Sequence, residues 1–130
     1  MAFIDVEAAV CEYLEPVAQT VTESGDIGGE ESYPDPPFII VSRVGGGADR
    51  QGVFDFAQVE INCIGVNRSG SYSLNSQVRQ LMNGQSAIGT SYGLIDFVTE
   101  DTAPTEIPYG LEQIDIRRAT STWIVSSRAL

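Results

Sequence analysis

The sequence contains neither lysine nor histidine among its 130 residues. Without histidine, the chain lacks the most common general base and zinc ligand at neutral pH. Without lysine, it has no side-chain amine for a Schiff base. All side-chain positive charge comes from seven arginines, which 18 acidic residues outweigh to give a net charge of −11. A protein that grips nucleic acid needs a basic surface, so this composition argues against that role.

Cysteine is scarce, and long apolar runs are missing. Cys11 and Cys63 fall in a predicted helix and a predicted strand, and we expect free, buried thiols rather than a disulfide. No apolar run approaches the roughly 20 residues that span a bilayer. The N-terminus also lacks the positively charged region of a signal peptide. We therefore expect no membrane association and synthesis in a cytosol.

Catalytic and cofactor-binding motifs are missing as well. The triple glycine Gly45–Gly47 precedes a predicted strand and lacks the spacing of a phosphate-binding loop. The acidic pairs Glu30-Glu31 and Glu100-Asp101 lie in no recognisable metal-ligand loop, so solvated loop charge explains them better than a divalent cation. Cys63 has no histidine to activate it, and no serine lies in a GxSxG turn. We expect a protein that is not an enzyme and binds no cofactor or metal.

The acidic residues are unevenly distributed. Arg43 is the first arginine of the chain, so the preceding part is purely acidic. Nine of the 18 acidic residues lie in that part: Asp5, Glu7, Glu12, Glu15, Glu23, Asp26, Glu30, Glu31 and Asp35.

The stretch from Phe38 to Val66 is the clearest structural signal. β-Branched and aromatic residues dominate its two arms, which flank a run of glycines. In the second arm the apolar residues alternate with polar ones, which is typical of a half-buried strand. This pattern predicts an antiparallel β-hairpin with a long, glycine-rich loop over residues 45–54. The alternating apolar residues are Ala57, Val59, Ile61 and Cys63, and the polar ones are Gln58, Glu60 and Asn62.

Two amphipathic helices are predicted. The first covers Asp5–Glu15, with Asp5 as its N-cap and Pro16 ending it. The second covers Ser71–Asn83 and ends at Asn83-Gly84. Its apolar stripe at helical spacing consists of Leu74, Val78, Leu81 and Met82.

The other segments are less regular. Residues 17–21 fit either a short strand or a continued turn. Residues 22–37 form an acidic loop, which serves either as an arm that orders on a partner or as a solvated connector. Residues 85–90 and 100–109 are predicted loops.

Two more strands complete the pattern. A third strand is predicted over Ser91–Thr99, with Tyr92, Leu94, Asp96 and Val98 on one face. The last strand covers Leu111–Arg128, and the parity of its apolar residues switches near Arg117-Arg118, which indicates a bulge or a bend. The two arginines point to opposite faces, and they serve either an inter-subunit ion pair with the acidic N-terminal half or an ordinary surface pair.

The order of predicted elements is α-β-β-α-β-β. We expect a single domain over residues 1–130 of the α+β class, with a mainly antiparallel sheet of about four strands. Both helices should cover one face of the sheet, giving a two-layer sandwich.

The same elements in this order resemble the tail terminator (tail completion) proteins of long-tailed bacteriophages, especially those of actinobacterial hosts. The resemblance spans nearly the whole chain. It rests on a helical start (DVEAAVCEYL), a proline leading into a strand and glycines (PPFIIVSRVGGG), a second strand (AQVEINCIGV), a helix (SLNSQVRQLMNG) and a last strand ending in TSTWIVSSRA.

This resemblance implies a virion structural protein. Family members form a ring, typically of six subunits, which sits on the last ring of the tail tube protein, stops its polymerisation and offers a surface to the head-closure or connector protein. Genome DNA passes through the lumen without sequence-specific binding, and assembly takes place in the host bacterial cytoplasm.

Family members use loops and sheet edges for ring contacts. By position, this directs attention to the glycine-rich loop, the acidic loop and the last strand. The candidate interface residues are Gly45, Gly46, Gly47, Asp49, Arg50, Glu30, Glu31, Arg117 and Arg118. Two other functions remain open: another phage neck protein, such as a head-closure component, or a cytosolic module that binds a small ligand or a protein.

Overall fold

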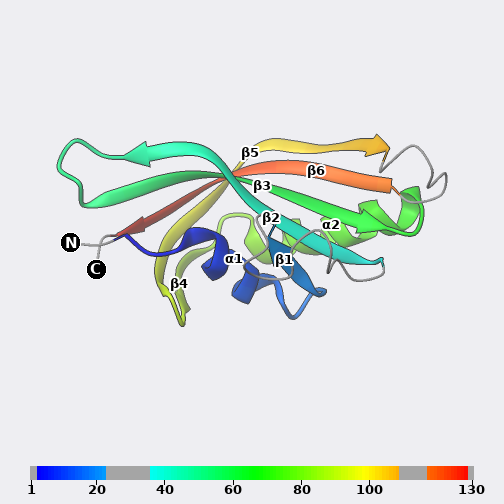
Figure 1. Ribbon diagram of the computed structural model, residues 1–130, viewed down its shortest axis with the longest axis horizontal. Helices are drawn as coiled ribbons and strands as arrows, with labels where there is room; N and C mark the ends of the chain where they lie inside the picture. The colour runs from blue at the N-terminus through cyan, green and yellow to red at the C-terminus, as the bar shows by residue number, and fades with distance from the viewer. Residues whose placement is uncertain (1–2, 23–35, 109–116, 129–130) are drawn as a thin grey trace.

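The protein is a two-layer α+β structure in which two helices cover one face of a curled sheet (Figure 1). The computed structural model describes residues 3–22, 36–108 and 117–128. In chain order the elements are α1 (Val6–Leu14), β1 (Thr20–Thr22), β2 (Phe38–Ala48), β3 (Phe54–Gly65), α2 (Arg68–Met82), β4 (Ser86–Thr90), β5 (Gly93–Pro108) and β6 (Arg117–Arg128).

The sheet has six strands in the order β1-β2-β3-β6-β5-β4. β1 runs parallel to β2, and every other neighbouring pair is antiparallel. β3 and β6 pair without a register shift, from Phe54 opposite Arg128 to Gly65 opposite Arg117. The last strand of the chain therefore lies inside the sheet, between β3 and β5.

Both predicted helices are present. The Asp5 side chain caps α1 by accepting the Ala8 N–H at 3.1 Å. α2 begins earlier than predicted because the Asn67 side chain caps it, accepting the Gly70 N–H at 2.8 Å. No helix in the described ranges is long and apolar enough to cross a membrane.

The main core lies between the helices and the sheet. The alternating residues of β3 predicted to be apolar and inward-facing are fully buried, and they meet the buried stripe of α2. Trp123 of β6 is also completely buried in this layer. The two-layer arrangement and the two free, buried thiols, Cys11 and Cys63, are thus confirmed.

The predicted number of strands, about four, is wrong, because residues 17–21 were left open between a short strand and a turn, and β4 was predicted to be a loop. β1 has three residues, too few to show an alternating pattern. Only Ile88 of the five residues of β4 is buried, so its sequence shows no alternation of apolar and polar residues.

The predicted long loop over residues 45–54 is also wrong. β2 continues through the glycines to Ala48, so the connection to β3 is only Asp49–Val53. The strand passes a register shift between Arg43 and Gly45. Just after it, Gly46 adopts a positive φ of 88°, which a residue with a Cβ rarely does.

β5 differs from its prediction in length and in register. It extends to Pro108, through the segment predicted to be an acidic loop. Ile95 and Val98 are buried, whereas Leu94 and Phe97 are exposed. This pattern replaces the predicted alternation because the register shifts between Ile95 and Phe97, leaving Asp96 in a bulge.

The bulge predicted near Arg117-Arg118 does not occur in the described part of the last strand. β6 is regular against β3 from Arg117 onwards, and the register shifts lie in β5 instead. The first part of the predicted strand, residues 111–116, lies outside the described residues.

Candidate subunit interface

An ion pair between exposed Arg43 and buried Asp55 joins the two strands of the β2–β3 hairpin. Arg43 donates two hydrogen bonds to the Asp55 carboxylate, at 2.6 and 2.7 Å, and the Asp55 side chain is only 4% exposed. The hydrogen bonds with Asp55 raise the pKa of Arg43 above its ordinary value. Glu7 of α1 also accepts the Arg43 backbone N–H at 2.7 Å. One arginine therefore joins both strands of the hairpin to the first helix.

The tip of this hairpin is ordered by its own residues. The Asp49 side chain accepts the N–H groups of Val53 at 2.8 Å and of Phe54 at 3.2 Å. Asp49 was predicted at a subunit interface, but its carboxylate is used within the turn. Arg50, predicted at the same interface, is exposed at the tip.

The three predicted glycines lie on an open edge of the sheet. β1 covers β2 only from Ile39 to Val41. Among the described residues, no strand lies beside Val44–Ala48 on the side away from β3. We call this segment the β2 edge.

The backbone of the β2 edge points outward at alternate residues. Asp49 donates its N–H to the Phe54 carbonyl oxygen across the hairpin, at 2.9 Å. Because alternate residues of a strand direct their backbone groups to opposite sides, those of Ala48 point away from β3. The edge therefore offers hydrogen-bonding groups to another strand.

A second open edge lies on the other side of the sheet. β4 pairs with β5 between Gly93 and Phe97, and one further bond joins the Val98 N–H to Gln85 O at 3.0 Å. Within the described ranges, no strand covers Thr99–Thr105 on the side away from β6. We call this segment the β5 edge.

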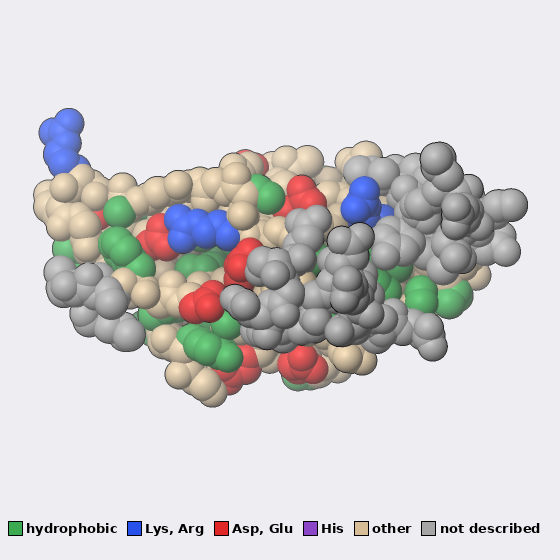
Figure 2. All heavy atoms as spheres, in the orientation of Figure 1, with side chains coloured by type: hydrophobic (Ala, Val, Ile, Leu, Met, Phe, Trp, Pro, Cys, Tyr) green, Lys and Arg blue, Asp and Glu red, His purple; other side chains and the backbone are tan. Residues whose placement is uncertain are grey.

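Charged residues lie beside both edges, and most of them are already paired. At the β5 edge, Arg79 pairs with Glu100, and Asp101 accepts hydrogen bonds from Gln58 and Thr122. Arg43 and Arg50 flank the β2 edge. Among the described residues, Arg50 has no ion-pair partner. Figure 2 shows that acidic and basic side chains are interspersed on the face of the molecule that is turned to the viewer in Figure 1.

Of the remaining predicted interface residues, only the side chain of Arg118 lies in the described part of the chain. Glu30 and Glu31 lie outside the described residues. Arg117 begins β6, and its side chain is not described. Arg118 lies opposite Ile64, on the helix-free side of β6, and its Nε is buried without a hydrogen-bond partner in the described part of the chain. In the described ranges β6 is an interior strand and offers no open edge, and the predicted role of Arg117 and Arg118 at an interface stays a prediction.

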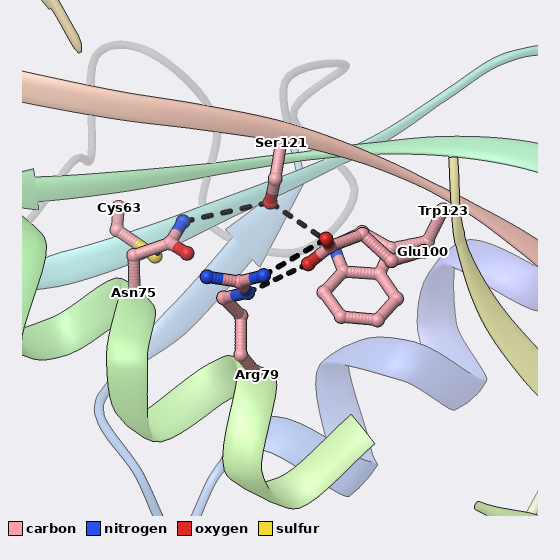
Figure 3. A network of polar contacts seen from close by, with 6 residues as sticks. All are labelled: Cys63, Asn75, Arg79, Glu100, Ser121 and Trp123. Atoms are coloured by element: carbon pink, nitrogen blue, oxygen red, sulfur yellow. Dashed lines mark hydrogen bonds and ion pairs between the residues drawn. The ribbon is translucent and has the colours of Figure 1, made fainter. Parts of the chain in front are cut away.

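Between α2 and the sheet lies a buried polar network (Figure 3). Trp123 Nε1 donates to Ser121 Oγ at 3.0 Å, and Asn75 Nδ2 donates to the same oxygen at 3.5 Å. At its margin, Arg79 donates two hydrogen bonds to Glu100, at 2.7 and 3.0 Å. These contacts fix α2 to β5 and β6, next to the β5 edge.

The chemistry of the described residues gives no nucleophile or metal centre. Burial raises the pKa of both Cys11 and Cys63 to about 12, so both thiols stay protonated at neutral pH. No group of three or more candidate metal ligands occurs in the described part of the chain. What the surface does offer is backbone hydrogen bonding at two edges.

Comparison with known proteins places this fold among virion components. A chain from a structure described as the virion of a native gene transfer agent particle matches with a TM-score of 0.60 and 14% identity, covering 90% of this chain and 84% of that one. No curated protein matches the sequence. The family model for phage tail termination proteins matches residues 2–129. The chain belongs to this family and is a structural protein of a phage tail.

Proposed function

We propose that the chain forms a ring that caps the tail tube, ends its polymerisation and provides the surface to which the head is joined. Membership of the tail termination family supports the role. The main structural support for self-assembly is that two edges on opposite sides of one sheet are uncovered among the described residues. One subunit can thus contact two neighbours through two different surfaces.

Such a head-to-tail contact has a definite consequence. Heterologous interfaces build either an open filament or a closed ring, and only a closed ring satisfies every interface and stops growing. A terminator must stop growing, because it ends a polymer instead of extending it. We propose a hexamer, with the tail tube protein on one side and the head-closure or connector protein on the other.

The proposed role needs no catalysis and no cofactor. The protonated thiols and the absence of histidine and lysine from the sequence support a purely structural protein. Genome DNA would pass through the lumen without being bound, because an acidic protein repels phosphate.

Ring formation should become stronger as salt is added. Six copies with a net charge of −11 carry about −66 in all, and salt screens this repulsion. Mass photometry of the purified protein should show the ring fraction rising between about 20 and 500 mM NaCl, where the Debye length falls from roughly 20 to 4 Å. Negative-stain images should show rings at the high-salt end.

A monomer at every salt and protein concentration would refute the ring. Rings that dissociate as salt is raised would show instead that surface ion pairs, not screened repulsion, control the assembly.

A further inference from the structure

We infer that neighbouring subunits join by strand addition, with the β2 edge of one subunit pairing with the β5 edge of the next. The inference rests on the proposed ring and names the surfaces that close it. The partner is a second copy of this chain. It contributes backbone hydrogen bonds along a strand rather than a side-chain pocket.

The β2 edge is suited to accept a strand. Proteins usually protect sheet edges with lysine, proline or a covering segment. Val44–Ala48 contains no proline and no charged residue, and three of its five residues are glycines without side chains. A Cβ added at Gly47 would meet no atom within 4 Å, so no neighbouring group packs over this face of the strand. The β5 edge contains Pro104 and register shifts on both sides of Thr102, so backbone pairing there is limited to part of Thr99–Thr105.

The direction of the strands permits the pairing. β2 is antiparallel to β3, β3 to β6, and β6 to β5. β2 and β5 therefore run in opposite directions within one subunit. If a rotation about an axis roughly along the strands relates the subunits, β2 meets an antiparallel β5 of its neighbour. The junction then continues the antiparallel order of the rest of the sheet.

The positions of the two edges predict that the strands tilt relative to the axis of the ring. Across the sheet, Gly46 is level with Ala57, Val125 and finally Val98, where the cover by β4 ends. The β5 edge begins after this row and extends toward the end of the sheet that β1 covers. Joining the two edges shifts each subunit along its neighbour by several residues. A closed barrel requires such a stagger, because its strands tilt relative to the axis.

Arg50 lies at the end of the β2 edge, is exposed and has no ion-pair partner among the described residues. At the β5 edge, Glu100 is paired with Arg79. The Asp101 carboxylate accepts hydrogen bonds from Thr122 of β6 and Gln58 of β3, so it lies over the sheet and not along the open edge. The junction therefore depends on backbone hydrogen bonds between the two strands, not on charge pairs across it.

Paired cysteine substitutions test the junction. Gly47, Thr102 and Thr105 lie opposite Phe56, Thr122 and Thr120, which all belong to the helix-free face. A cysteine at Gly47 of one subunit and a cysteine at either threonine of the next would therefore both lie on the helix-free face, on the two sides of the junction. We expect mild oxidation of Gly47→Cys/Thr102→Cys or Gly47→Cys/Thr105→Cys to give a ladder of covalent oligomers larger than dimers on a non-reducing gel. The native thiols are buried and should not take part.

Controls separate this inference from the proposed ring. Each single-cysteine variant should give no ladder, because a heterologous contact does not bring a residue beside its own copy. Gly89→Cys combined with Thr102→Cys should also give none, since Gly89 lies on β4, away from the β2 edge. Rings present in mass photometry without a ladder from either pair would overturn the inference and leave the ring standing. Efficient dimers from Gly47→Cys alone would overturn it in favour of a symmetric contact. A monomer under all conditions would refute the ring and the junction together.

Discussion

Replacing Gly46 with alanine is expected to lower the free energy of unfolding by about 3 kcal/mol, because the new side chain has neither the space nor the backbone conformation it needs. A Cβ at Gly46 would lie 1.9 Å from the Phe56 carbonyl oxygen and 2.8 Å from the Gln58 nitrogen, both backbone atoms of the paired strand. The φ of 88° adds strain for any residue with a Cβ. In a thermal melt followed by circular dichroism, the midpoint should fall by roughly 10 °C.

Gly47→Ala is the matched control for this substitution. It makes the same chemical change one residue further along the same edge, where nothing lies within 4 Å of the new Cβ. Its free energy of unfolding should stay within about 0.5 kcal/mol of the parent value. If both variants melt like the parent, the β2 strand does not pass Gly46 in this conformation, and the proposed edge is absent.

Replacing Arg43 with alanine should also cost about 3 kcal/mol, because it leaves the buried Asp55 carboxylate without its partner. The two hydrogen bonds of 2.6 and 2.7 Å would be lost, and the Asp55 side chain is only 4% exposed to water. Chemical denaturation with urea would measure the loss. The double variant Arg43→Ala/Asp55→Ala should be more stable than Arg43→Ala alone, because the uncompensated charge is then gone.

Arg128→Ala provides the comparison on the surface. Arg128 pairs with Asp96 at 3.0 Å, but its side chain is 61% exposed, so its loss should cost less than about 1 kcal/mol. Equal losses for Arg43→Ala and Arg128→Ala would show that burial of Asp55 does not determine the strength of the first pair.

The sequence was most informative where a pattern extends over many residues. Both helices and the β3 alternation from Ala57 to Cys63 follow from periodicity, because burial on one side selects apolar residues at a fixed spacing. The caps at Asp5 and at Asn83-Gly84 follow from local chemistry. The resemblance to tail terminators was confirmed by the family match over residues 2–129.

The open edges could not be predicted in the same way. They depend on where β1 and β4 stop covering their neighbours, and these strands have only three and five residues. The glycines were correctly singled out, but for the wrong reason. A run of glycine is typical of a loop, whereas here Gly45–Gly47 belong to β2, directly after its register shift. The bulges of β5 likewise hide its alternation.

Capping of tail tubes is the most direct test of the whole account. Purified tail tube protein should be polymerised with and without this chain carrying a gold label, and the tubes measured by negative-stain electron microscopy. We predict shorter tubes in the presence of the chain, with label at one end only. Label along the tube walls, or tubes of unchanged length with no label at either end, would contradict the proposed termination of tail growth.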